Sequence, residues 1–131
     1  MNPNTLLTDQ SVDPMVVLLM ACDLTVDDLL SLRRGHVYSG AVVVLDRPPF
    51  KRRSLLVPME ARWALRPRGH LGFDPDTHLF ADQHGALPTR AQVLEVVGQH
   101  LDLLHQRRQT QPVQRAIRRL ARAYRQALAA A

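Results

Sequence analysis

Cysteine is nearly absent from this sequence, since Cys22 is the only one among 131 residues. A single thiol excludes an intrachain disulfide framework and a zinc site built from several thiolates, and it is typical of a reducing compartment. Long apolar runs are absent too: the longest, residues 15–22, has eight residues, whereas a membrane-spanning helix needs about 20. No cationic segment precedes that run as a signal peptide requires. The sequence therefore predicts a soluble, cytoplasmic protein with no membrane partner.

Lysine is equally scarce, because Lys51 is the only lysine among seventeen basic residues. The net charge of +5 hides a gradient: residues 1–30 hold five acidic residues and no basic one, whereas residues 106–131 hold seven arginines and no acidic residue. A basic end fits a polyanionic partner, because binding to phosphates releases condensed counterions. An arginine-rich coding bias also explains a high isoelectric point, so the uneven distribution of charge along the chain is more informative than the isoelectric point.

The common motifs for catalysis and cofactor binding are missing. The sequence has no P-loop, no glycine-rich dinucleotide fingerprint, no His-Glu-x-x-His and no Gly-x-Ser-x-Gly. Its six histidines are scattered, and His100 and His105 are too far out of phase to share one side of a helix. We therefore expect no metal, no cofactor and no small-molecule substrate, and we interpret Cys22 as a small core residue rather than a nucleophile.

The first third of the chain is predicted to be helical. Residues 1–10 are interpreted as a flexible leader. A nearly all-apolar helix follows from Pro14 to about Asp23 and must be buried. Thr25 caps the next helix, which we expect to end at Arg33 and Arg34 with Gly35 as its C-terminal stop.

The middle of the chain is predicted to be extended. Residues 41–45 and 54–58 form a β-hairpin with a basic, proline-containing turn, and residues 59–65 form a short helix before a loop over residues 66–72. Residues 77–80 are a candidate third strand.

Two helices are predicted at the C-terminal end. Thr89 opens the first with a capping box. The second begins after Thr110 and has an apolar stripe, opposite which arginines gather. The stripe contains Val113, Ile117, Leu120, Tyr124 and Leu128.

These elements predict a mainly α fold with a small antiparallel β-sheet (α+β). The expected organisation is a flexible leader over 1–10, a core over 11–110 that contains the basic hairpin 41–58, and an arginine-rich C-terminal helix over 111–131.

The order of these elements resembles the first part of the catalytic domain of tyrosine recombinases, the phage-integrase family. Residues 23–37, Asp-Leu-Thr-Val-Asp-Asp-Leu-Leu-Ser-Leu-Arg-Arg-Gly-His-Val, follow the apolar pattern of the family's first signature. Residues 51–59, Lys-Arg-Arg-Ser-Leu-Leu-Val-Pro-Met, match its hairpin lysine and following strand. Residues 79–89, Leu-Phe-Ala-Asp-Gln-His-Gly-Ala-Leu-Pro-Thr, match its Leu-Phe, glycine turn and capped helix. The resemblance covers residues 12–105 and extends loosely over the last helix.

The resemblance implies a degenerate catalytic site. Strand cleavage in this family needs two arginines on the phosphate, a lysine acid, a His-x-x-Arg helix and a tyrosine nucleophile. Lys51 stands at the family's lysine position, but Thr25 stands where the first arginine belongs. The nearest His-x-x-Arg register, Arg115 to Arg118, has lost its histidine, while the same letters at His105 come too early in the element order. Neither Tyr38 nor Tyr124 lies at the nucleophile's position. We therefore expect a partial recombinase-like fold with no catalytic residues.

The cationic residues then predict binding of double-stranded DNA, in a regulatory role in a mobile-element, phage or plasmid process, with the protein at the nucleoid. Three alternatives stay open: a solvated face without a ligand, a protein-interaction module that pairs with itself or with a recombinase, and a split enzyme whose partner chain supplies the tyrosine. The candidate DNA-binding residues are Arg33, Arg34, Lys51, Arg52, Arg53, Arg115, Arg118, Arg119, Arg122 and Arg125.

Overall fold

A fully buried helix, α2 (Pro14–Ala21), lies at the centre of the molecule in a computed structural model that describes residues 5–45, 52–66, 74–82, 84–107 and 109–129. Every residue of α2 after Pro14 is buried. The helix is therefore apolar on all sides, because elements pack around it on all sides. Asp13 caps it by accepting a hydrogen bond from the Met15 N–H at 2.9 Å.

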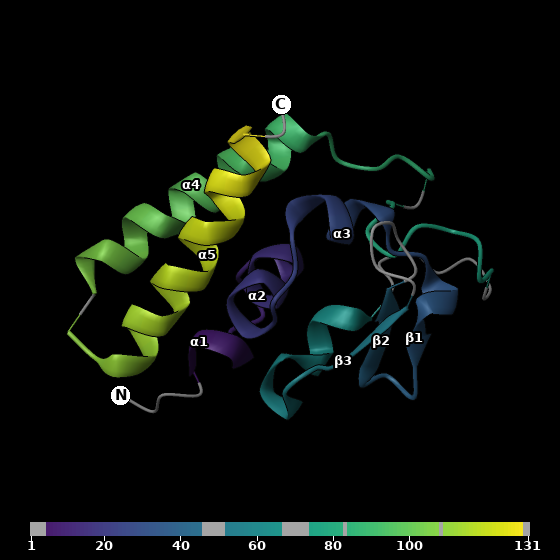
Figure 1. Ribbon diagram of the computed structural model, residues 1–131, viewed down its shortest axis with the longest axis horizontal. Coiled ribbons are helices and arrows are strands. Elements are labelled where there is room, and N and C mark those ends of the chain that lie inside the picture. The colour runs from purple at the N-terminus through teal and green to yellow at the C-terminus, as the bar shows by residue number, and fades with distance from the viewer. Residues whose placement is uncertain (1–4, 46–51, 67–73, 83, 108, 130–131) are drawn as a thin grey trace.

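Two long helices cover one side of α2. Helices α4 (Arg90–Gln106) and α5 (Gln111–Ala129) lie antiparallel to each other and both contact α2 (Figure 1). The short 3₁₀ helix η2 (Met59–Leu65) contacts α2 as well, from the side of the sheet. Buried residues of α5 therefore belong to the same hydrophobic cluster as those of α2 and α4.

Capping boxes fix where α3 (Val26–Ser31) and α4 begin. The Asp28 N–H donates to Thr25 Oγ1, and the Thr25 N–H donates to Asp28 Oδ2, both at 3.0 Å. Thr89 and Gln92 exchange the same pair of bonds at the start of α4. The sequence predicted the box at Thr89 and the hydroxyl cap at Thr25, because each motif lies within four residues.

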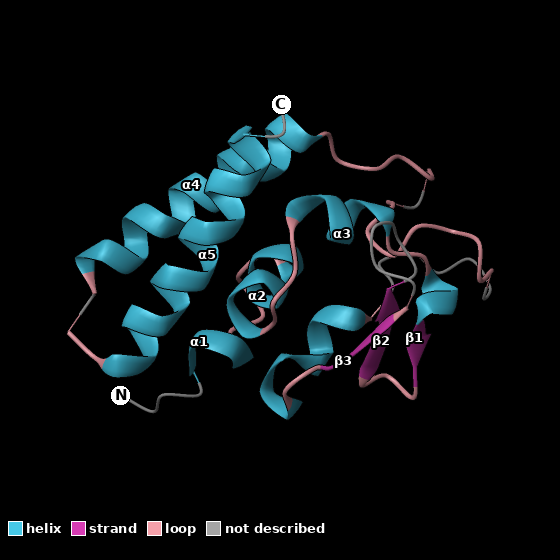
Figure 2. Cartoon of the chain, viewed as in Figure 1, coloured by secondary structure: helices cyan, strands magenta, loops and turns pink. Residues whose placement is uncertain are grey.

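A three-stranded antiparallel sheet stands at the other side of the molecule (Figure 2). Its order is β1 (Val37–Tyr38), β2 (Val42–Leu45) and β3 (Arg53–Leu56). Strands β2 and β3 pair from Val42 with Leu56 to Leu45 with Arg53, so the predicted hairpin is confirmed. The tip of the hairpin, including Lys51, lies outside the described residues. The mainly α fold with a small antiparallel sheet is thus present.

The region between α3 and the sheet differs from the prediction. Helix α3 ends at Ser31, and Arg34–His36 form a separate 3₁₀ turn, η1. Arg33 leaves the helix because its backbone forms a β-bridge with His78. The predicted third strand over 77–80 is therefore reduced to that single bridge. Strand β1, which was not expected, takes the edge of the sheet instead.

Gly35 is not the C-terminal stop of α3, because it lies in the middle of η1. Its N–H donates to the Pro75 carbonyl at 3.0 Å, and a Cβ at this position would lie 2.9 Å from the Pro75 Cβ. Gly35 is therefore required for a close approach of two segments rather than for a helix end.

The flexible-leader interpretation does not hold for the described part of residues 1–10. Thr5–Thr8 form one helical turn, α1, and Leu6 and Leu7 pack partly against the core. The Trp63 indole Nε1–H donates to the Leu7 carbonyl, which ties α1 to η2.

The predicted stripe of α5 packs against the core except at its last residue. Val113 and Leu120 are buried as expected and Ile117 and Tyr124 are partly buried, but Leu128 is 50 % exposed. Alanines occupy the other buried positions and let α5 approach α2 and α4 closely. These alanines are Ala116, Ala123 and Ala127.

Among the described residues, no helix is both long enough and apolar enough to cross a membrane.

Candidate nucleic-acid interface

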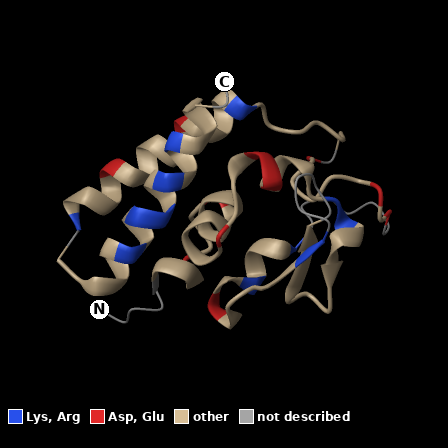
Figure 3. Ribbon diagram, in the orientation of Figure 1, with Lys and Arg blue, Asp and Glu red and all other residues tan. Residues whose placement is uncertain are grey.

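Five arginines occupy the side of α5 that faces away from the core, and we refer to them as the arginine face. They all lie outside the buried stripe and are all exposed. Spacings of three and four residues place side chains on one side of a helix, and α5 contains no acidic residue. Figure 3 shows the resulting succession of basic positions along α5. The arginine face consists of Arg115, Arg118, Arg119, Arg122 and Arg125.

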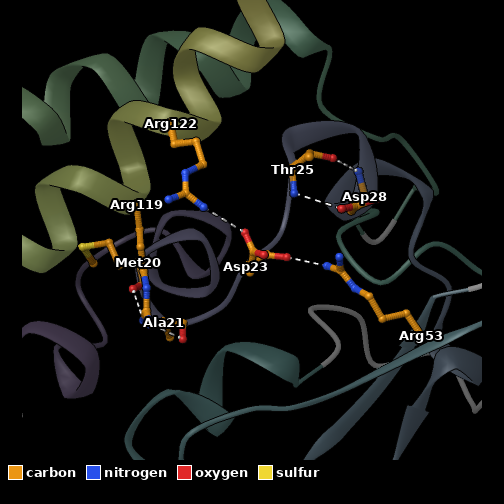
Figure 4. A network of polar contacts seen from close by, with 8 residues as sticks. All are labelled: Met20, Ala21, Asp23, Thr25, Asp28, Arg53, Arg119 and Arg122. Atoms are coloured by element: carbon orange, nitrogen blue, oxygen red, sulfur yellow. Dashed lines mark hydrogen bonds and ion pairs between the residues drawn. The ribbon is translucent and has the colours of Figure 1, made fainter. Parts of the chain in front are cut away.

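Arg119 is the member of the arginine face that also supports the fold. Its Nη1 donates to the Met20 carbonyl at 3.2 Å and to the Ala21 carbonyl at 3.1 Å (Figure 4). These carbonyls belong to the last turn of α2, where no partner is available within the helix. Arg119 therefore acts as a C-terminal cap for α2, supplied from another helix.

Arg122 and Arg53 meet at Asp23, in the corner between α2 and α3. The Arg122 Nη1 lies 3.6 Å from the Asp23 carboxylate, and the Arg53 Nη2 donates to the Asp23 backbone carbonyl. Figure 4 shows the two guanidinium groups approaching Asp23 from opposite sides, one from α5 and the other from β3. We call Arg53, Arg119 and Arg122 the arginine corner.

The arginine corner keeps an excess of positive charge. Arg119 binds backbone carbonyls, which are neutral, so only the Asp23 carboxylate offsets the two guanidinium groups among Asp23, Arg119 and Arg122. Arg122 and Asp23 are both largely exposed, so their ion pair is weak and a competing anion can displace it. Guanidinium groups bind phosphate oxygens well because their N–H groups form a planar fork.

Cys22, which precedes Asp23, is buried. Burial raises the pKa of its thiol to about 11, and the positive charge of Arg119 opposes that rise in part. The thiolate is the reactive form of cysteine, and a raised pKa reduces its fraction at neutral pH. The burial of Cys22 confirms its interpretation as a core residue.

Thr25, which stands where the recombinase resemblance places its first arginine, has a structural role. The Thr25 hydroxyl accepts the capping hydrogen bond of α3. Tyr124 is half-buried, and its ring lies over Gly98 of α4, 3.6 Å from where a Cβ would stand. Tyr38 lies on the edge strand β1. Among the described residues, neither tyrosine hydroxyl forms a hydrogen bond with the arginine corner.

The remaining candidate residues are spread over the molecule. Arg52 is exposed next to β3, and Arg33 is exposed but donates to the Asp76 carbonyl. Arg34 is only 7 % exposed, which removes it from the cationic surface. The prediction that Arg34 lies at the exposed end of α3 was wrong, because α3 ends at Ser31. Lys51 lies outside the described residues, so its position relative to the arginine corner is not defined.

Sequence reasoning missed Asp23 as the centre of the corner, and it missed Arg62 and Arg66, which line a cavity next to η2 with Arg34. No local pattern marks Asp23, because its partners are 30 and 99 residues away along the chain. In the described part of the chain, no group of three or more histidine, cysteine or acidic side chains is placed to hold a metal ion.

Comparison of the chain with protein-family models, with curated proteins and with solved structures gives no match.

Proposed function

We propose that the protein binds the phosphate backbone of double-stranded DNA through the arginine face and the arginine corner, as a non-cleaving relative of tyrosine recombinases that regulates a mobile-element process. The observation that carries the proposal is the division of α5 into a buried stripe and an exposed side with five arginines and no acid. A surface with one sign of charge attracts a polyanion over a distance, which favours fast association.

The arginine face is long enough to contact several phosphates. Its first and last members are ten residues apart, which corresponds to about 15 Å along the helix axis. The side chains of Arg115, Arg118 and Arg125 form no hydrogen bond or ion pair with any other described residue, so their guanidinium groups are available. Contacts of this kind position a protein on DNA without reading its sequence.

The proposal includes the absence of strand cleavage by this chain alone. Thr25 is neutral and holds the start of α3, and Tyr124 is packed against α4. A nicked DNA substrate that traps covalent intermediates should give no protein–DNA adduct on a denaturing gel. An adduct that disappears with Tyr124→Phe or Tyr38→Phe would contradict this part of the proposal.

Binding of labelled duplex DNA over a series of salt concentrations tests the main proposal. The variant R115Q/R118Q removes two charges from the arginine face and leaves Arg119 and Arg122 to support the fold. Its matched control, R62Q/R66Q, removes two charges from η2 and the residue that follows it, on the other side of α2.

We expect log Kd to depend steeply on log salt for the unchanged protein, and the slope to fall by about two for R115Q/R118Q, since each lost phosphate contact removes about one ion. R62Q/R66Q should bind DNA nearly as the unchanged protein does. No binding at low salt, or equal losses in both variants, would overturn the proposal.

One observation favours a second function, pairing through the sheet. Tyr38, Val42 and Leu56 stand opposite one another across the three strands, and registered partners point to the same face. Tyr38 is 49 % and Leu56 is 69 % exposed, so an apolar row is open to a partner.

Pairing through this row should persist at high salt, unlike DNA binding. Sedimentation equilibrium in high salt would then show a dimer for the unchanged protein and for Leu103→Ser, an exposed leucine on α4, but a monomer for Leu56→Ser. A monomer throughout would exclude self-pairing through the sheet.

A further inference from the structure

We propose that a cavity between β1 and η2 binds a small amphipathic organic anion, a carboxylate carried on a hydrocarbon or aromatic body. The cavity has a volume of 620 Å³, within the range of about 300 to 1,000 Å³ that is usual for small-molecule sites. It lies across α2 from the arginine face, because η2 and α5 both contact that helix from different sides. It is therefore a separate site from the proposed DNA interface, and it departs from the expectation that no small molecule is involved.

The charge of the cavity selects an anion. Arg34, Arg62 and Arg66 line it, and none of the described residues that line it is acidic. The Arg62 Nε donates to the Val57 carbonyl at 3.0 Å, which holds its side chain in place. The terminal nitrogens of Arg62 form no hydrogen bond with another described residue, so they are available to a carboxylate. Arginine suits this role because its fork of N–H groups matches the two carboxylate oxygens.

The walls select an apolar body. Leu65 and Leu79 are almost fully buried at the inner side of the cavity, whereas Met59 is 74 % exposed at its outer side. Trp63 adds an aromatic wall, and its indole is held by the hydrogen bond to the Leu7 carbonyl. Met59 is flexible and adapts to different ligand shapes. A cavity that is open at one side and apolar inside takes up hydrocarbon from water.

Neither the arginines nor the apolar walls of the cavity specify the ligand class alone. A free phosphate or a sugar phosphate would leave the apolar walls in contact with polar groups, which is unfavourable. A neutral hydrocarbon would gain nothing from the guanidinium groups. An amphipathic carboxylate satisfies both parts of the lining.

Titration of the ¹⁵N-labelled full chain with decanoate, below its micelle concentration, tests this inference. Decanol has the same chain without the charge, and acetate has the charge without the chain. We expect saturable shifts at amides of η2 and β1 with decanoate and at least tenfold weaker binding of both comparison compounds. 1-Naphthoate in place of decanoate distinguishes an aromatic from an aliphatic body.

Two variants separate the cavity from non-specific binding to basic residues. R62Q/R66Q should weaken decanoate binding at least tenfold, and R115Q/R118Q should leave it unchanged. Arg66→Gln alone serves if the double variant does not fold, because the Arg66 side chain is exposed and forms no hydrogen bond with a described residue. Equal binding of decanol and decanoate, or no effect of either η2 variant, would overturn the inference. DNA binding is measured on the same proteins, so failure of one site is distinguishable from failure of the other.

Discussion

Arg119 donates to the last two carbonyl groups of α2 while its charge contributes to the arginine face. Its exposed neighbour Arg118 has the same charge and forms no hydrogen bond with another described residue. Two adjacent arginines therefore differ in what their loss would do. Loss of Arg119 would lower both the stability of the fold and any binding of an anion. Loss of Arg118 would affect binding alone.

We predict that Arg119→Gln lowers the free energy of unfolding by about 1 to 2 kcal/mol, the usual range for hydrogen bonds from a charged group after discounting for partial exposure. Arg118→Gln should change it by less than about 0.5 kcal/mol, as exposed substitutions do. Urea unfolding followed by circular dichroism measures both. Equal stabilities would mean that the cap on α2 contributes nothing.

Cys22 gives a second prediction at this scale. Because burial raises the pKa of its thiol to about 11, the folded protein should react with a thiol reagent such as DTNB at pH 8 far more slowly than the unfolded protein does. The absorbance of the released thiolate, with and without urea, measures the two rates. Rapid stoichiometric labelling of the folded protein would show that the side chain is accessible.

At the scale of elements, the sequence predicted where helices begin better than where they end. The capping boxes at Thr25 and Thr89 lie within four residues, so both helix starts could be read locally. The end of α3 could not, because Arg33 is drawn into a bridge with His78, 45 positions along the chain. The buried alanines of α5 were not predicted for a related reason: they become buried only because α2 and α4 approach closely.

Substitutions at two glycines test how closely these elements pack. Gly98→Ala should stabilise the protein by about 0.5 to 1 kcal/mol, because alanine is the better helix former and its Cβ would meet the Tyr124 ring at an ordinary 3.6 Å. Gly35→Ala should destabilise it by about 1 to 3 kcal/mol, the usual cost of overpacking, because its Cβ would lie 2.9 Å from the Pro75 ring.

Thermal unfolding of the two alanine variants measures both effects in one experiment. A stabilising Gly35→Ala would show that the segment around Pro75 moves away without cost. A destabilising Gly98→Ala would show that α4 and α5 are closer than the geometry at Tyr124 indicates.

At the scale of the whole molecule, folding brings the two ends of the charge gradient together. The acidic first third contacts the basic last third through Asp23 and Arg122, and Asp27 pairs with Arg90 between α3 and α4. These two pairs therefore offset part of the gradient, and the exposed surplus is left on the arginine face.

Stability should fall as the pH decreases below neutrality. Burial, with a smaller contribution from Arg107, lowers the pKa of His100 below its ordinary 6.5, and Asp9 opposes this shift. Burial, followed by the charge of Arg33, lowers the pKa of His78 in the same way. The unfolded chain then binds more protons than the folded chain, so stability is highest above pH 6.5 and is lost as the pH falls through the folded pKa values.

Urea midpoints measured from pH 8 to pH 5 test this expectation, with His100→Gln as the comparison. The variant should lose less stability over that interval than the unchanged protein does. His105→Gln, at an exposed position on α4, should behave as the unchanged protein. An identical pH dependence for all three would contradict the burial of His100 as its cause.

The sequence by itself determined the features that depend on neighbouring residues: the buried apolar helix α2, the two capping boxes, the β2–β3 hairpin and the arginines that α5 keeps off its apolar stripe. Helix α2 rests on an uninterrupted apolar run, and the other features rest on periodicity or on hydrogen bonds a few residues apart. The tertiary structure alone decided that Asp23 joins Arg53 and Arg122, that Arg34 is buried, and that three arginines share a cavity with Trp63. Those arrangements depend on which segments pack against α2, and long-range packing leaves no local pattern in the chain.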